Sequence, residues 1–278
     1  MQRQDDARAY YDELGADEWD RMTRTPADLV SLEIHRRFLE RHIEPGWRVL
    51  EIGAGPGRFT LQLAELGAHI AVTDISDVQL RLNEERLRAS EWESAVESWR
   101  IVDVCDTSHY QDDEFDAVVA FGGPLSYAFE KTEAAIHDLL RITNGPLIAS
   151  VMSLLGTWRH QFTAVTELES RVGVEANDAV LRTGDLRHLS DAAHVCQMFR
   201  WTDIEAIVHR AGGTIQDGSA SNWSALADPD AVATVHADPV RWAHFLQHEV
   251  CACAEPGARD GGTHILFAAT RSRGLTAE

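Results

Sequence analysis

One stretch of the sequence, residues 49–76, constrains the fold more than any other. It reads VLEIGAGPGRFTLQLAELGAHIAVTDIS. The apolar residues 49–52 predict a buried strand, and the glycine-rich turn after them allows positive φ and a close approach of ligand to backbone. Residues 58–66 have the apolar spacing of an amphipathic helix, and residues 70–72 form the next apolar segment. This order predicts a β-α-β unit with parallel strands and a right-handed crossover.

The β-α-β unit predicts a nucleotide-binding site. Ligands of open α/β sheets bind at the carboxyl ends of the strands, beside a glycine-rich turn. Asp74 follows the second apolar segment, and its carboxylate can accept two hydrogen bonds from a ribose diol. The dinucleotide fingerprint G-x-G-x-x-G requires glycine where this chain has Arg58. The pattern that the chain carries is E-x-G-x-G-x-G, which begins at Glu51 and ends at Gly57.

This pattern, with an apolar strand before it and an acidic residue after the next strand, resembles the class I methyltransferases, which bind S-adenosylmethionine (SAM). The segment FDAVV at residues 115–119 is similar to the fourth-strand motif of that family. The N-terminal YYDELGADEWDRM is loosely similar to a segment that folds over the cofactor as a lid, with Trp19 where tyrosine is more usual. The resemblance implies SAM as the cofactor and these binding residues: Glu51, Gly53, Ala54, Gly55, Gly57, Asp74, Ile75, Asp103, Val104, Phe121 and Gly122.

The resemblance also implies a role for each of these residues. Glu51 and the glycines of the turn surround the methionine moiety, and Phe121 and Gly122 contribute backbone near the amino group and the sulfonium. Asp74 takes the ribose hydroxyls, and Ile75 packs on the adenine.

Two acidic residues compete for the adenine edge. Asp103 and Val104 follow residues 100–102, which predict the third strand, and they match the family's acid and the backbone N–H after it. Asp106 stands nearby and is the alternative acid; otherwise it is a solvated turn residue.

The alternation of strands and helices through five strands predicts a doubly wound parallel sheet. With the family resemblance, we expect an α/β fold with a mostly parallel seven-stranded sheet, an N-terminal helical lid and an insertion after strand five. A last strand antiparallel to the others would fit the family. The expected parts are the lid (1–46), the SAM-binding core (47–152), an acceptor-site insertion (153–200) and a C-terminal completion of the sheet (201–278).

The sequence indicates less about the methyl acceptor. A general base is needed only if the nucleophile must lose a proton. Tyr127, just past the fourth strand, has the best position for a catalytic or orienting group, and the other candidates are Tyr11, His35, His160 and His194.

We expect the acceptor to be held by the lid and by residues 153–201, because the core strands use their carboxyl-end residues on the cofactor. Residues 194–199 alternate between apolar and polar and predict an edge strand or a pocket wall. Both segments are rich in aromatic side chains, which offer large apolar contacts to an acceptor. The alternative is that these aromatics only seal a second hydrophobic core: Tyr10, Tyr11, Trp19, Trp158, Phe162, Phe199 and Trp201.

The charge of the chain bears on its partners. The net charge is −20, and Lys131 is the single lysine. Such an acidic surface suits high salt, so a halophilic source is a hypothesis; a high-GC genome would also replace lysine by arginine. We find no cluster of basic residues with interleaved aromatics, so a nucleic-acid partner is disfavoured.

The remaining features favour a cytoplasmic protein that is a monomer or a homodimer. The chain has no apolar run long enough for a bilayer, and its polar N-terminus does not read as a secretory signal. We expect no metal site, because the cysteines lack paired ligand spacing and read as small core residues: Cys105, Cys196, Cys251 and Cys253.

These observations predict a SAM-dependent methyltransferase that acts on an O, N or C nucleophile of a small molecule. Two alternatives stay open. The first is methylation of RNA or of a protein, which would require a basic or peptide-sized groove. The second is a SAM-binding regulatory protein without turnover.

Overall fold

The computed structural model describes residues 2–189 and 195–272. Its centre is a seven-stranded sheet in the order β3-β2-β1-β4-β5-β7-β6. Neighbouring strands from β3 to β5 are parallel, and β7 runs antiparallel to both β5 and β6. The predicted mostly parallel, doubly wound sheet is thereby confirmed. The strands are β1 (Arg48–Ile52), β2 (His69–Asp74), β3 (Val96–Ile101), β4 (Ala117–Ala120), β5 (Leu147–Met152), β6 (Gly213–Ala220) and β7 (His264–Arg271).

The third strand lies earlier in the chain than its apolar pattern predicts. β3 begins at Val96 and ends before Val102, whereas the sequence pattern indicated residues 100–102. The reason is that β3 is an edge strand, paired only with β2, and its sequence VESWRI is half exposed. An edge strand that is solvated on one side does not show the continuous apolar run of a buried parallel strand.

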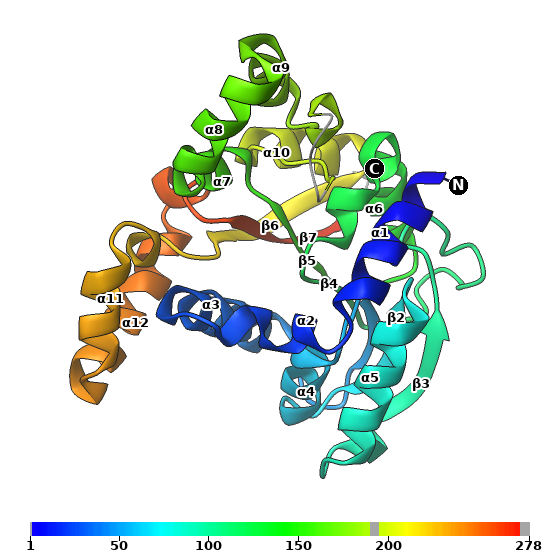
Figure 1. Ribbon diagram of the computed structural model, residues 1–278. Coiled ribbons are helices and arrows are strands. Elements are labelled where there is room, and N and C mark those ends of the chain that lie inside the picture. Colours follow the sequence, from blue (N-terminus) through cyan, green and yellow to red (C-terminus); the bar gives the residue numbers. More distant parts are fainter. Residues whose placement is uncertain (1, 190–194, 273–278) are drawn as a thin grey trace, which may run out of the picture.

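Helices cover both faces of the sheet (Figure 1). α4 begins at the position predicted from the sequence, and α11 was not predicted. Their bounds are α1 (Gln2–Leu14), α2 (Asp17–Asp20), α3 (Pro26–His42), α4 (Arg58–Glu65), α5 (Asp77–Arg88), α6 (Thr132–Arg141), α7 (Leu154–His160), α8 (Phe162–Val172), α9 (Val174–Thr183), α10 (Trp201–Arg210), α11 (Pro229–His236) and α12 (Pro239–Ala254).

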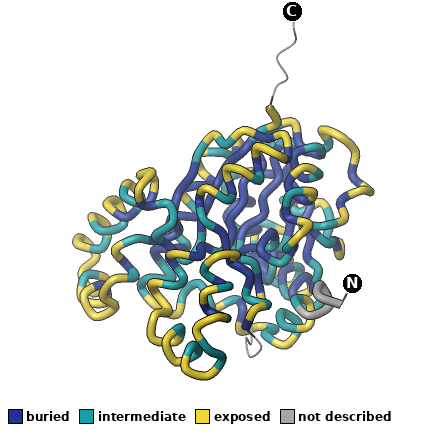
Figure 2. The backbone as a smooth tube through the Cα atoms, turned by 90° about the horizontal axis from the view of Figure 1, so that it is seen from above, coloured by how far each residue is buried: buried dark blue, intermediate teal, exposed yellow. Residues whose placement is uncertain are grey.

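Side chains that alternate along the strands divide the core into two layers. Leu50 and Val118 point to the face covered by α6 and α10, where they share one apolar cluster. Val49 and Val119 point to the opposite face and pack with α3, α4 and α12. The buried strands therefore lie between two helical layers, with exposed residues along the outer helices (Figure 2).

The helix α3 begins at Pro26 because Thr25 caps it. Thr25 Oγ1 accepts a hydrogen bond from the Asp28 N–H at 3.2 Å, and Asp28 Oδ2 accepts one from the Thr25 N–H at 2.9 Å. This reciprocal pair is a capping box, and a cap of this kind is worth about 1 kcal/mol. It fixes the end of α3 that faces the carboxyl edge of the sheet.

The segment after β5 is largely helical. α7, α8 and α9 extend to Thr183, and a small apolar cluster stabilises them. Residues 195–199 form no strand; Gln197 and Phe199 make single bridges, to Asp185 and Ser153. Phe199 and Trp201 are buried in the main core, so for these two the interpretation as core residues holds.

Candidate functional site

The glycine turn between β1 and α4 is held open by positions that only glycine suits. Gly53 has φ of 70°, and a Cβ there would lie 3.0 Å from Pro124 Cβ. Gly57 has φ of 100°, and a Cβ would lie 3.3 Å from the amide group of Asn83. Both conformations disfavour any other residue, so the turn keeps its backbone close to whatever lies at the carboxyl ends of β1 and β4.

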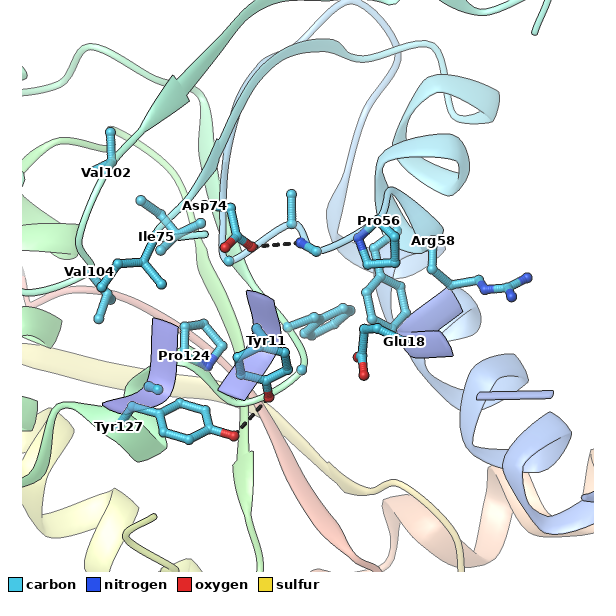
Figure 3. A pocket seen from close by; sticks show the side chains of 18 of the residues that line it. Tyr11, Glu18, Pro56, Arg58, Asp74, Ile75, Val102, Val104, Pro124 and Tyr127 are labelled. Carbon is cyan, nitrogen blue, oxygen red and sulfur yellow. Dashed lines mark hydrogen bonds between the residues drawn. The ribbon is translucent and has the colours of Figure 1, made fainter. Parts of the chain in front are cut away.

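Asp74 closes β2 and points into the space above the turn (Figure 3). Its Oδ2 accepts a hydrogen bond from the Gly55 N–H and its Oδ1 accepts one from the Ser76 N–H, both at 2.8 Å. The side chain is 6% exposed, and burial raises its pKa to about 6. Each oxygen keeps a lone pair, so the carboxylate can accept further hydrogen bonds from a ligand.

Glu51 does not line the cavity but supports the turn from behind. Its carboxyl group accepts a hydrogen bond from Thr60 Oγ1 at 2.6 Å. Thr60 accepts from Asn83 Nδ2 at 2.8 Å, and Asn83 Oδ1 accepts from Trp99 Nε1 at 3.0 Å. Burial raises the pKa of Glu51 to about 8. Gly57 is likewise absent from the cavity wall, so these two members of the motif act on the turn rather than facing its opening.

A cavity lies over the glycine turn and Asp74, and we call it the first cavity. Its empty space of about 950 Å³ includes volume at the mouth that is open to solvent. Residues of α1, α2 and the turn after them line it, and Figure 3 shows Tyr11 and Glu18 among its side chains. The predicted site residues that line it are Gly53, Ala54, Gly55, Asp74, Ile75, Asp103, Val104, Phe121, Gly122, Tyr11 and Tyr127.

The two acidic residues after β3 lie in different surroundings. Asp103 lines the first cavity, and its Oδ1 accepts a hydrogen bond from the Cys105 N–H at 2.8 Å. Asp106 is exposed and bonds to Ser108 instead. Asp103 is therefore the acid in position to meet a ligand.

Tyr11 and Tyr127 meet over the first cavity. Their hydroxyl oxygens lie 2.7 Å apart, and their rings make an edge contact with centroids 5.8 Å apart (Figure 3). Burial raises the pKa of both phenols well above the ordinary value. Both hydroxyls therefore stay protonated near neutral pH, which suits hydrogen bonding and orientation rather than service as a general base.

Several charged residues of the cavity wall were missed by sequence reasoning. Arg21 Nε donates to both carboxylate oxygens of Glu18 at 2.8 Å. The i, i+3 spacing of these two residues is the sequence pattern from which this ion pair could have been predicted. Two guanidinium groups lie over the Trp19 ring, with the Arg58 Cζ 3.8 Å and the Arg86 Cζ 4.5 Å from the ring centroid. These contacts fasten α2 to α4 and α5.

A second cavity adjoins the first, and it contains two of the predicted candidates. His35 and His160 line it, and Arg21, Met22 and Gly122 line both cavities. His160 is exposed and is the residue that the insertion 153–200 contributes to this wall, within the described residues. His194 lies outside the described residues. The remaining wall comes from α3, the loop after β6, α11 and the start of β7.

In residues 2–189 and 195–272, no group of three or more His, Cys, Asp or Glu side chains could hold a metal ion. None of the helices in the same ranges has the length and apolar character needed to traverse a bilayer.

Comparison with known proteins shows which proteins the region around the first cavity resembles. Residues 49–145 match a family model described as a methyltransferase domain. The probable cobalt-precorrin-6B C(15)-methyltransferase (decarboxylating) of Thermoplasma acidophilum is 30% identical over 125 residues, which are 44% of this chain and 58% of that protein. The tuberculostearic acid methyltransferase UfaA1 of Mycobacterium tuberculosis is 34% identical over 138 residues, 47% of this chain and 31% of that protein. The chain thus spans less than two thirds of the length of these relatives.

A solved structure extends the likeness of fold over nearly the whole chain. Magnesium protoporphyrin IX methyltransferase from Synechocystis, with bound S-adenosylhomocysteine (SAH), aligns with a TM-score of 0.59 at 15% identity. The alignment covers 96% of this chain and 98% of that one. At this identity the likeness concerns the fold.

Proposed function

We propose that this chain is a class I SAM-dependent methyltransferase and that it transfers the methyl group of SAM to an O, N or C nucleophile of a small molecule. One observation carries the proposal. Asp74 and the backbone of the glycine turn face the same cavity, at the carboxyl ends of parallel strands, where a nucleotide is expected.

The residues of the first cavity fit SAM group by group. The Asp74 carboxylate suits the ribose diol, and the apolar Ile75 and Val104 suit the faces of the adenine. The Glu18 carboxylate also lines the cavity (Figure 3), where it accepts hydrogen bonds from Arg21. The glycine turn leaves room for the methionine moiety. Gly122, at the end of β4, would lie near the sulfonium.

SAM supplies an electrophilic methyl group, so the protein's part is mainly alignment. Holding two reactants in line at near-attack distance is worth up to roughly 7–11 kcal/mol. Tyr11 and Tyr127 would join the covering segment to the loop after β4 and exclude water, with their hydroxyls available to orient ligand groups. The covering segment at residues 1–46 would thus act as a lid.

The cytoplasmic location and the state of monomer or homodimer stay predictions.

Two features favour a small acceptor: the N-terminal segment over the first cavity, and the negative net charge of the chain. The first cavity lies under the N-terminal segment, and the net charge of −20 disfavours polynucleotides. The names of the two curated relatives refer to a cobalt-precorrin and to tuberculostearic acid, both small molecules. We therefore favour a small-molecule acceptor over RNA or protein, and over a regulatory protein without turnover.

Transfer of a labelled methyl group tests this function. The purified protein is incubated with methyl-labelled SAM and a metabolite extract, and small molecules are separated from macromolecules by ultrafiltration. We expect label in the small-molecule fraction, beyond that in a sample without protein. Label in the macromolecular fraction would favour RNA or protein as the acceptor. Tight SAM binding with no transfer to any fraction would favour the regulatory alternative.

A further inference from the structure

The two cavities meet at Gly122. Arg21, Met22 and Gly122 line both of them. Gly122 follows β4 and has φ of 78°, and its N–H donates to Ser150 Oγ at 3.0 Å. A group that extends past Gly122 out of the first cavity therefore enters the second cavity.

His35 presents an unprotonated ring nitrogen to the second cavity. Its Nδ1 lies 2.7 Å from the carbonyl oxygen of Ser31, which can only accept, so Nδ1 carries the hydrogen and Nε2 is an acceptor. No other group in the described ranges hydrogen-bonds Nε2. The side chain is 2% exposed, and burial lowers its pKa to about 4, so the ring is neutral at physiological pH. The ring contacts Phe121 edge-on with centroids 4.8 Å apart, beside Gly122.

Asn222 presents a hydrogen-bond donor to the same cavity. Its Oδ1 accepts from the Thr263 N–H at 3.1 Å and from Ser221 Oγ at 3.0 Å. Because a backbone N–H can only donate, this bond fixes which amide atom is the oxygen. The Nδ2 group is then left for a ligand, since no described residue accepts from it and the side chain is 3% exposed. Buried amides are usually fully bonded, so this donor points to a binding role.

The loop after Asn222 is held rigidly by a buried carboxylate. Glu249 on α12 accepts hydrogen bonds from the N–H groups of Trp223 at 2.9 Å and Ser224 at 2.7 Å. α11 and α12 both pack against α3, so the elements that carry Asn222 and His35 belong to one packed unit (Figure 1). The donor and the acceptor are thereby held in fixed places on the cavity wall.

The charged side chains in the wall of the second cavity already have hydrogen-bond partners. Arg21 donates to Glu18, and the Asp28 carboxylate accepts from the N–H and the Oγ1 of Thr25 in the capping box. The rest of the wall combines histidine, hydroxyl and amide side chains with apolar side chains from Met22, Leu226 and Val232. A charged ligand would leave water for a wall whose charged groups are already hydrogen-bonded, which is costly.

We propose that the second cavity is the acceptor site and that it takes an uncharged polar molecule. This inference rests on the proposed function. A nucleophilic O–H or N–H group donates to His35 Nε2, and a neighbouring oxygen accepts from Asn222 Nδ2. In the transfer the carbon–sulfur bond breaks, its electron pair stays on sulfur, and a bond from the methyl carbon to O or N forms. The proton of the nucleophile passes to Nε2 and then to water.

The test uses methyl-labelled SAM, a metabolite extract and variants of the full chain. Filtered products are passed over anion and cation exchangers, which also retain unreacted SAM. With the unmodified protein, we expect the labelled product in the fraction that neither exchanger retains, which holds the uncharged molecules. His35→Ala and Asn222→Ala should each lower the initial rate at least tenfold, with SAM affinity by calorimetry within threefold. His35→Gln keeps a neutral acceptor near the position of Nε2 and should restore part of the rate.

His42→Ala is the matched control, because His42 lies on the same helix and bonds to Asp217 outside both cavities. It should leave the rate unchanged. Label retained on an exchanger as product, or full rates in both His35→Ala and Asn222→Ala, would overturn the inference while leaving the methyltransferase intact. If an alanine variant unfolds at a lower temperature than the unmodified protein, its rate is not used. The rates of His35→Gln and Asn222→Ser are then compared, provided that these variants keep the melting temperature of the unmodified protein. Absence of SAM binding by the unmodified protein would instead overturn the proposed function, and the inference with it.

Discussion

Replacement of Asp74 by alanine is expected to weaken SAM binding by about 10- to 100-fold. A hydrogen bond to a charged group contributes about 1.5–3 kcal/mol, and every 1.4 kcal/mol is a factor of ten. The carboxylate sits at the end of β2 with a lone pair on each oxygen beyond its bonds to Gly55 and Ser76. Calorimetric titration with SAM and with SAH measures the effect, and NAD should bind poorly to both forms.

The affinity should also depend on pH through Asp74. Burial raises the pKa of this carboxyl to about 6, and the charged form is the one that accepts from both hydroxyls. Affinity should therefore be constant above pH 7 and fall by up to tenfold per unit below pH 6. Asp74→Asn should remove that dependence. Asp106→Ala serves as the control, since Asp106 is an exposed residue outside the cavity. Equal affinity of Asp74→Ala and the unmodified protein would exclude Asp74 as the ribose ligand.

Replacement of Glu51 by glutamine is expected to stabilise the protein increasingly as the pH rises. Burial raises the pKa of Glu51 from 4.5 to about 8, so the folded state keeps a proton that the unfolded state releases near pH 4.5. Stability from this group is fully present below pH 4.5 and is lost as the pH rises towards 8. The loss is about 1.4 kcal/mol per pH unit. Glutamine is neutral at every pH and can still accept from Thr60.

Urea unfolding at pH 6, 7 and 8 measures this difference. The free energy of unfolding of Glu51→Gln, relative to the unmodified protein, should rise by about 2 kcal/mol between pH 6 and pH 8. Glu44→Gln, a change at an exposed position before β1, should show no such trend. A difference that stays constant over this range would mean that Glu51 does not titrate there.

The part of the fold that local sequence dictates was predictable. The apolar strands, the glycine turn and the capped start of α3 depend on residues within a few positions of one another, and their order fixes a parallel sheet. Ile75, Asp103 and Gly122 could be placed beside Asp74 for the same reason, since each follows or ends a strand of that sheet. The edge strand β3 was harder because one side of it is solvated.

The second cavity could not be predicted from sequence because its wall joins residues far apart in the chain. His35 and Asn222 come from elements that meet only when α3 packs against α11 and α12. The same limit applies to Glu51, whose motif position resembles a ligand contact although its bond to Thr60 turns it away from the cavity. In both cases tertiary packing determines what a side chain faces, and no local pattern records it.

The structure of the protein with bound SAH is the most direct test of the account. We predict that the ribose hydroxyls lie within hydrogen-bond distance of the Asp74 carboxylate, with the adenine between Ile75 and Val104. The sulfur should lie beside Gly122, with its open side facing the second cavity. SAH bound away from the glycine turn, or with its sulfur directed away from Gly122, would contradict the account.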